Sequence, residues 1–266
     1  MQPLLNIAVR AARRAADLIV RSLNRLDSLE VSSKGRNDYV TEVDRAAEAD
    51  IIATIRRAYP DHAFLGEESG QIGSGPVEWI IDPLDGTTNF IHGLPHFCVS
   101  IGARVRGRIE HGVVYDPMRQ EVFTASRGDG AHLENRRMRV SAQRTLEGAL
   151  IGTGFPYRAN TEYLDTYLAM LKDVMLNTAG VRRPGSAALD LAYVAAGRTD
   201  GFFEIGLGPW DTAAGSLLVE EAGGRVGTLS GGEFQQGGNI IAASPKVYEA
   251  LVALLAPHLT PNLREN

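Results

Sequence analysis

The stretch that decides the fold is residues 79–89, with the sequence WIIDPLDGTTN. Its first three residues form a continuous apolar run, which is typical of a buried strand. Pro83 fixes its own φ and has no N–H for a sheet ladder, so we expect the strand to end at Asp82. The strand end would then present two carboxylates, from Asp82 and Asp85, and the backbone carbonyl of Leu84.

The same stretch carries groups that suit both a metal ion and a phosphate. Hard carboxylate and carbonyl oxygens are the ligands that Mg²⁺ prefers. The glycine-rich turn at Gly86 and Thr87 offers backbone N–H groups to a phosphate. This combination indicates metal-dependent phosphoryl transfer. On local evidence alone, Asp82-Pro83 and Asp85-Gly86 would also be explained as two ordinary turn dipeptides. The other motifs of the chain are needed to choose between a metal site and two turns.

The composition indicates an ordinary globular protein. The chain has 266 residues, of which 44% are hydrophobic and 22% charged, enough for one large domain or two small ones. The net charge of −5 argues against general nucleic-acid binding. The N-terminus lacks the apolar core of a signal peptide, and no run reaches the length of a membrane span. With one cysteine, Cys98, we expect a cytoplasmic protein with no membrane partner and no direct nucleic-acid partner.

Hydrophobic periodicity predicts alternating helices and strands along the whole chain. Helices are expected at 3–26, from about 44 to 58, and at 163–176, 187–196, 212–222 and 245–256. Strands are expected at 62–65, 79–82, 97–105, 109–115, 121–126, 150–156, 201–204 and 239–243. The closely spaced strands between residues 97 and 126 predict an antiparallel meander. Residues 70–76 are rich in glycine and predict a surface loop or a flap.

Three further acids stand in places that suit the same site. Glu67 follows an apolar run, one loop upstream of the central strand. Asp211 opens an alanine-rich helix, and Asp44 opens another. A helix N-cap would explain Asp44 and Asp211 by itself, although Thr41 is also a plausible N-cap of the second helix. A third acid beside Asp82 and Asp85, however, would complete a cluster able to hold two metal ions.

Three separated motifs together resemble the inositol monophosphatase family, and bacterial members of the extragenic-suppressor type in particular. They are GEES at 66–69, WIIDPLDGTTN at 79–89 and WDTAAG at 210–215, in matching order and spacing over nearly the whole chain. The resemblance implies an α/β fold, a layered αβαβα sandwich with mixed and antiparallel sheets. It implies one domain over 1–266, with subdomains at about 1–150 and 151–266, and a homodimer. It also implies a lithium-sensitive phosphatase with about two or three Mg²⁺ ions per site.

The resemblance implies a ligand set for these ions. Glu67, Asp82 and the carbonyl of Leu84 would hold one ion. Asp82, Asp85 and Asp211 would hold a second, so that Asp82 bridges the two. Several carboxylates facing divalent ions leave a cluster near neutral, which can still accept an anionic phosphate.

The resemblance assigns the remaining roles to groups around the ligand set. Thr87, hydrogen-bonded to Asp44, would orient the attacking water together with Glu67. The N–H groups of Gly86 and Thr87 would bind the phosphate, beside Asp85. The groups implied to contact the hydroxyls of a sugar alcohol are the Ala188 backbone, Glu204 and the open side of Asp211.

The activity that we expect is hydrolysis of myo-inositol 1-phosphate and related polyol phosphates by a metal-activated water. Fructose-1,6-bisphosphatases and nucleotide 3′-phosphatases share these metal motifs and remain alternatives. A different class also remains, because some bacterial members of the family bind Nus factors and RNA polymerase in transcription antitermination. That role would use surface arginines, for which solvated charge is the simpler explanation; the candidates are Arg10, Arg13, Arg14, Arg182 and Arg183.

Overall fold

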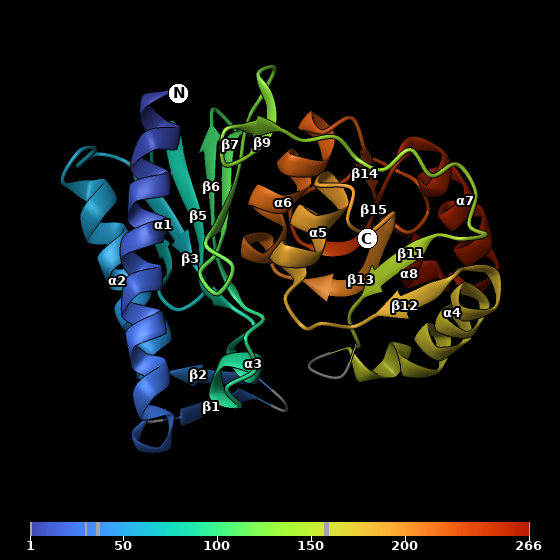
Figure 1. Cartoon of the computed structure of the whole chain (residues 1–266), viewed down its shortest axis with the longest axis horizontal. Helices are drawn as coiled ribbons and strands as arrows, with labels where there is room; N and C mark the ends of the chain where they lie inside the picture. Colours follow the sequence, from blue (N-terminus) through green and yellow to red (C-terminus); the bar gives the residue numbers. More distant parts are fainter. Residues whose placement is uncertain (1, 30, 36–37, 157–159, 266) are drawn as a thin grey trace.

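The protein is a stack of five layers, in which helix pairs alternate with two β-sheets (Figure 1). The computed structural model describes residues 2–29, 31–35, 38–156 and 160–265. The helix pairs, from one outer face to the other, are α1 (Pro3–Ser22) with α2 (Glu42–Arg56), α5 (Ala187–Ala195) with α6 (Pro209–Glu221), and α4 (Leu164–Asn177) with α7 (Pro245–Leu255). The expected αβαβα sandwich is therefore confirmed.

The first sheet has eight strands in the order β10-β9-β8-β7-β6-β5-β3-β4. Their bounds are β3 (Ala63–Gly66), β4 (Gly70–Ile72), β5 (Val77–Asp85), β6 (Cys98–Val105), β7 (Arg108–Asp116), β8 (Glu121–Ser126), β9 (Gly130–Leu133) and β10 (Arg136–Arg137). From β5 to β10 each strand pairs antiparallel with the next, which confirms the meander. The β3–β5 pair is parallel, so the sheet is mixed.

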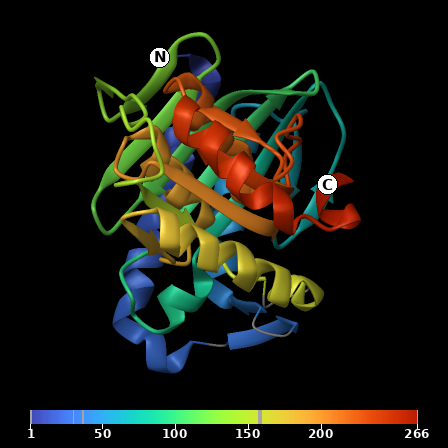
Figure 2. The same cartoon turned by 90° about the vertical axis from the view of Figure 1, so that its right-hand side faces the viewer.

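The second sheet has five strands in the order β12-β11-β13-β15-β14. Their bounds are β11 (Leu150–Thr153), β12 (Gly180–Arg182), β13 (Gly201–Leu207), β14 (Arg225–Gly227) and β15 (Gly238–Ala243). Figure 2 shows α4 and α7 lying across the outer face of this sheet. The two sheets come from separate parts of the chain, and the subdomain boundary near residue 150 stays a prediction.

The remaining described elements are short. They are η1 (Leu23–Ser28), β1 (Val31–Gly35), β2 (Asp38–Thr41), α3 (Thr87–Ile91), η2 (Thr161–Tyr163), η3 (Ala256–His258) and α8 (Pro261–Glu265). In the described part of the chain, no helix has both the length and the apolar character that crossing a membrane requires.

Three apolar layers hold the sandwich together, and successive strand residues face different layers. Trp79 and Ile81 pack toward α1 and α2, whereas Ile80 packs toward α5 and α6. In the second sheet Phe202 faces the central helices and Phe203 faces the outer pair. Both faces of each sheet are covered, which agrees with the continuous apolar run at the start of β5. The strand β6 is also buried on both faces, although alternation along 97–105 is typical of a half-buried strand.

Two glycines bring the central helix α6 unusually close to the first sheet. A Cβ on Gly102 of β6 would lie 2.9 Å from the Cβ of Ala213, and one on Gly112 of β7 would lie 2.9 Å from the carbonyl oxygen of Ala214. Backbone can approach this closely only where no side chain intervenes. The N-terminal turn of α6, which carries Asp211, is thereby held beside the strand that carries Asp82.

The prediction that the central strand ends at Asp82 is wrong, because β5 continues to Asp85. The register of β5 on β6 shifts between Asp82, which pairs with Ser100, and Asp85, which pairs with Cys98. The extra residue is a bulge, and a bulge accommodates a proline that a regular ladder would reject.

Other boundaries also differ from the sequence prediction. The helix expected at 212–222 begins at Pro209, so Gly208 rather than Asp211 is its N-cap. The first helix ends at Ser22 and continues as the 3₁₀ turn η1. The second helix begins at Glu42 and its N-cap is Thr41, one of the two expected candidates, whereas Asp44 completes the capping box. Part of the predicted loop at 70–76 is the strand β4, which pairs with β3.

Candidate active site

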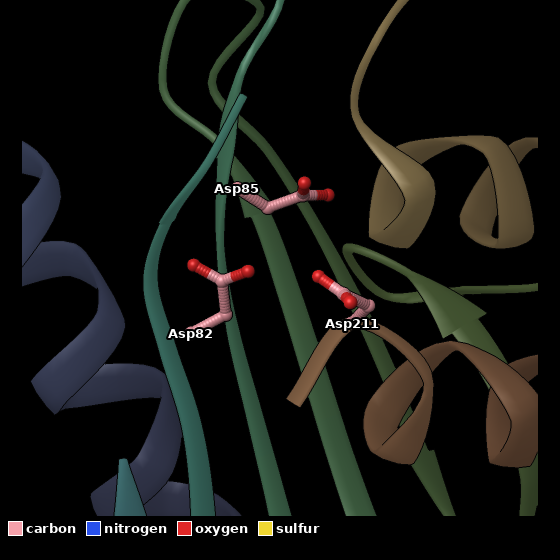
Figure 3. Close-up of side chains that lie close together, drawn as sticks. All are labelled: Asp82, Asp85 and Asp211. Atoms are coloured by element: carbon pink, nitrogen blue, oxygen red, sulfur yellow. The ribbon is translucent and has the colours of Figure 1, made fainter. Parts of the chain in front are cut away.

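Three carboxylates from two elements converge between the first sheet and α6. Asp82 and Asp85 come from the bulged end of β5, and Asp211 from the first turn of α6 (Figure 3). One carboxylate oxygen of each lies within 4.8 Å of one oxygen of each of the others. Asp82 and Asp85 are buried and Asp211 is half-buried. The family resemblance implied this convergence, and both strand carboxylates lie at the bulged end of β5.

Local hydrogen bonds fix two of these carboxylates in place. Asp82 Oδ1 accepts the N–H of Leu84 at 3.0 Å, across the bulge. Asp211 stands at the third helical position of α6, and its Oδ2 accepts the N–H of Gly208 at 2.6 Å. The Ser100 hydroxyl donates to the carbonyl of Trp210 at 3.3 Å and ties the start of α6 to β6. The side chains are therefore oriented before any ligand binds.

Asp85 is held by the start of α5. Its Oδ2 accepts the Ser186 hydroxyl at 2.7 Å and the Ala188 N–H at 2.7 Å. The Ala188 N–H is therefore committed to Asp85, and its side chain is fully buried, whereas Ala187 lines the cleft. A contact between the Ala188 backbone and a substrate hydroxyl stays a prediction. Ser186 was missed by the sequence, because its partner is 101 residues away.

The acid cluster is electrostatically unfavourable on its own. Burial raises the pKa of Asp82 well above its usual range, and the nearby charges of Glu67, Asp85 and Asp211 raise it further. Burial likewise raises the pKa of Asp211, with Asp85 and Glu67 adding to the effect. Buried carboxylates normally require a cation or a proton as compensation. A set of hard carboxylate oxygens fits Mg²⁺, whose preferred ligands they are.

A hydroxyl and a buried acid lie beside the cluster. Thr87 Oγ1 is 2.8 Å from Asp44 Oδ1 and 3.0 Å from the carbonyl oxygen of Leu84, so the hydrogen bond expected between Thr87 and Asp44 is present. Asp44 Oδ2 also accepts the backbone N–H of Thr41 at 2.8 Å, in a capping box at the start of α2. Burial raises the pKa of Asp44, and the hydrogen bonds from Thr41 and Thr87 act in the opposite direction.

Gly86 makes the turn between these groups sterically possible. Its φ is +103°, in the left-handed region that favours glycine. A Cβ there would also lie 3.0 Å from the carbonyl oxygen of His96 and 3.1 Å from the Cβ of Phe97. The sharp turn lets Thr87 begin α3 directly after the last β5 residue, Asp85. Binding of a phosphate by the Gly86 and Thr87 N–H groups stays a prediction.

A cleft of about 330 Å³ opens from the acid cluster toward the second sheet. The predicted residues that line it are Glu67, Asp85, Gly86, Glu204 and Asp211. Glu204 comes from β13, and its carboxylate occupies the space that a side chain at Gly154 would fill, 1.9 Å from an ideal Cβ. The cleft therefore joins the acid cluster at one end to a second acidic position at the other.

The sequence did not assign Asp190 to the site and considered Arg183 only as a surface arginine, but both line the cleft. Asp190 lies on α5 and is only 2% exposed. Burial raises its pKa well above the usual range, the charges of Glu204 and Asp85 add to this, and Arg183 opposes it. The guanidinium of Arg183 lies 5.0 Å from the centre of the Phe155 ring. A lone acid within the apolar run AALDLAYVA was the signal that could have identified Asp190.

The chain matches the model of the inositol monophosphatase family over residues 1–260. Nus factor SuhB of Pseudomonas aeruginosa is 59% identical over 270 residues, which cover 99% of this chain and 100% of that protein.

Two solved structures are similar over nearly their whole length. The extragenic suppressor protein suhB of Bartonella henselae has a TM-score of 0.92 at 47% identity, covering 96% of this chain and 98% of that chain. The inositol monophosphatase of Anabaena has a TM-score of 0.83 at 39% identity, covering 96% and 95%. On sequence and fold together, this chain belongs to the inositol monophosphatase family.

Proposed function

We propose that this protein is a Mg²⁺-dependent phosphomonoesterase that hydrolyses myo-inositol 1-phosphate and related polyol phosphates. The observation that carries the proposal is the convergence of Asp82, Asp85 and Asp211, with oxygens within 4.8 Å of one another. The hydroxyl of Thr87 and the cleft that ends at Glu204 adjoin this cluster. A phosphate monoester is very slow to hydrolyse, so such a site must supply large transition-state stabilisation.

The metal would be held by the acids and one backbone oxygen. We assign Glu67, Asp82 and the Leu84 carbonyl to one ion, and Asp82, Asp85 and Asp211 to a second. Bound Mg²⁺ would lower the pKa of water, neutralise phosphoryl oxygens and stabilise the leaving alkoxide. We also expect Li⁺ to inhibit turnover, as the resemblance implies.

The protein groups around the metal orient the nucleophile. When the Thr87 hydroxyl donates its proton to Asp44, 2.8 Å away, its oxygen can accept a hydrogen bond from the attacking water. With Glu67 as a further partner, this water would be oriented for attack on phosphorus. Such positioning, rather than a covalent enzyme intermediate, is the contribution that phosphoryl transfer requires of a protein.

The far end of the cleft favours a polyol over a second phosphate. The Glu204 and Asp211 carboxylates can only accept hydrogen bonds when ionised, so they suit the hydroxyls of a sugar alcohol. Asp190 also lines the cleft, close enough to Glu204 for their charges to interact, and adds a second acid there. An additional phosphate, as in fructose 1,6-bisphosphate, would meet these acids. Among the described residues that line the cleft, Arg183 is the one cation that would oppose the repulsion.

The substrate is tested by phosphate release from three esters: myo-inositol 1-phosphate, fructose 1,6-bisphosphate and a 3′-phosphonucleotide. We expect the highest kcat/KM for the inositol ester. A preference for another ester would keep the mechanism and overturn the substrate assignment. No turnover of any ester by folded protein with Mg²⁺ would overturn the phosphatase proposal.

The outer surface of α4 supports a homodimer as the working assembly. Leu168, Met175 and Leu176 are 49%, 61% and 73% exposed, a cluster of apolar side chains that monomers rarely leave in water. We propose that a second copy covers this surface. Light scattering should give twice the chain mass, and Leu168→Glu should shift the mass toward the monomer. An unchanged mass in that variant would exclude α4 from the interface.

A second function is favoured by the relatives named Nus factor SuhB, one of them 55% identical in Escherichia coli. We propose that this protein also binds Nus factors and RNA polymerase, in the cytoplasm, through surface groups rather than through the metal site. The test is co-purification with those factors from cells expressing the wild type or Asp85→Asn. Binding that survives the substitution supports a separate surface role, and no binding by either protein excludes it.

A further inference from the structure

Glu48 is a buried carboxylate that the proposed chemistry does not use. It lies on α2 and is only 3% exposed. Its Oε2 accepts the N–H of Glu68 at 3.0 Å, and its Oε1 accepts the N–H of Ser69 at 2.8 Å. Such charge-assisted hydrogen bonds are stronger than neutral ones. Both carboxylate oxygens of Glu48 therefore hold one loop, the loop that carries Glu67.

Gly66 allows the loop to lie directly on this carboxylate. A Cβ on Gly66 would lie between 2.3 and 2.8 Å from the three carboxylate atoms of Glu48, closer than any side chain can sit. On its other side, the N–H of Glu67 donates to the carbonyl of Ile81 on β5 at 3.1 Å. The N–H of Glu67 is thus held by β5, and the N–H groups of the next two residues, Glu68 and Ser69, are held by Glu48.

We propose that Glu48 is a positioning residue for Glu67, and that it sets the Mg²⁺ affinity of the site by fixing the direction of the Glu67 carboxylate. The inference rests on the proposed function, in which Glu67 is a metal ligand. Glu67 already lies close enough to Asp82 to raise the pKa of that acid. Groups that orient a metal ligand commonly change metal affinity about 10- to 100-fold when removed.

The test substitution is Glu48→Gln, which keeps the size of the side chain and removes its charge. The amide nitrogen cannot accept a hydrogen bond, so one of the two loop N–H groups loses its partner. Mg²⁺ binding is measured by the rise in Tm with Mg²⁺ concentration, a readout that needs no turnover. We expect the half-saturating Mg²⁺ concentration to rise at least about 10-fold.

Glu221 provides a matched control outside the site. Its carboxylate oxygens accept the N–H groups of Gly128 and Gly130, both at 2.9 Å, and so hold the turn between β8 and β9. Both Glu221→Gln and Glu48→Gln should lower the Tm in EDTA, because each removes a charge-assisted hydrogen bond. Glu221→Gln should leave the half-saturating Mg²⁺ concentration unchanged. If Glu48→Gln behaves in the same way as this control, Glu48 is merely structural and the inference is overturned.

A double-mutant cycle with Glu67→Gln tests whether Glu48 acts through Glu67. The double variant should bind Mg²⁺ no more weakly than Glu67→Gln alone, because the coupled effect is already lost. Losses that add would overturn the inference. If Glu48→Gln does not fold, Glu48→Asp gives the same readouts with a carboxylate withdrawn by one methylene.

Failure of this inference can be told apart from failure of the proposed function. Wild-type turnover of a phosphate ester, with an unchanged Mg²⁺ requirement in Glu48→Gln, overturns the positioning role alone. If Mg²⁺ stabilises the wild type but no ester is hydrolysed, the phosphatase proposal is overturned. The role of Glu48 is then still decided by comparing the Mg²⁺ dependence of Tm in Glu48→Gln, Glu221→Gln and the wild type. If Mg²⁺ does not stabilise the wild type, both are overturned.

Discussion

Asp82→Asn should make the metal-free protein more stable and the Mg²⁺-bound protein less stable. The substitution removes a buried charge from the acid cluster and keeps the size of the side chain. Its amide oxygen can still accept the Leu84 N–H, which Asp82 Oδ1 accepts at 3.0 Å. The local structure of the bulge is therefore preserved, and the change in stability reports on charge.

The size of the effect follows from the spacing of the carboxylates. Two unit charges 4.8 Å apart repel by about 3 kcal/mol at an effective dielectric constant of about 20. The raised pKa values of Asp82 and Asp211 allow the cluster to bind a proton, which relieves part of this repulsion. We therefore expect a net gain of about 1–2 kcal/mol in EDTA, or a Tm rise of about 2–8 °C for a domain of this size.

Mg²⁺ should reverse the order of stability. At a Mg²⁺ concentration of about 100 times Kd, the wild type gains about 2.7 kcal/mol of unfolding free energy. The variant lacks the proposed bridging ligand and should gain much less. Thermal unfolding followed by circular dichroism, in EDTA and across a Mg²⁺ series, measures both effects.

The control for this experiment is Asp61→Asn, which removes an exposed carboxylate outside the cleft. It should leave both the Tm in EDTA and the stabilisation by Mg²⁺ near their wild-type values. An Asp82→Asn protein that is less stable than wild type in EDTA, or equally stabilised by Mg²⁺, would refute the electrostatic account of the cluster.

Three other predictions follow from the geometry of the site. Thr87→Val should lower kcat about 100-fold or more while the Tm rise with Mg²⁺ is kept, because the variant loses water positioning and keeps the acids. Gly154→Ala should raise KM for a polyol phosphate about 10-fold or more and change KM for p-nitrophenyl phosphate little, because its Cβ displaces the Glu204 carboxylate. In EDTA, stability should fall as pH rises from about 4 toward neutrality, because raised pKa values at Asp82 and Asp211 mean that the folded chain binds more protons than the unfolded one.

Each of these has a clear contrary result. A Thr87→Val enzyme with wild-type kcat would remove the hydroxyl from the mechanism. Equal KM changes for both esters in Gly154→Ala would mean that Glu204 does not bind the hydroxyls of the polyol. A metal-free Tm that rises with pH above about 4 would show that the acids are not kept protonated by folding.

The fold was predictable where local patterns determine structure. The apolar run Trp79–Ile81 predicted a strand covered on both faces, and helix pairs do cover both faces of β5. The closely spaced strands between residues 97 and 126 predicted the antiparallel meander, which is present. The bulge between Asp82 and Asp85 was not predictable in this way, because Pro83 argues locally for a strand end and only the partner strand β6 shows that pairing resumes.

The site was predictable to the extent that its residues lie in dense motifs. Asp82 and Asp85 lie in the motif at 79–89, and Asp211 lies in the motif WDTAAG at 210–215, in the first turn of α6. Ser186, which orients Asp85, was missed because the two residues are 101 positions apart in the sequence. Glu48 had no signal of its own, since one acid in an amphipathic helix is normally a solvated residue.

The most direct test of the central claim is phosphate release from myo-inositol 1-phosphate as a function of Mg²⁺, by the wild type and by Asp85→Asn. The asparagine can still accept the Ser186 hydroxyl and the Ala188 N–H, so the fold should be kept. We predict Mg²⁺-dependent turnover by the wild type and loss of most of it in the variant. Full Mg²⁺-dependent activity in folded Asp85→Asn would contradict the account.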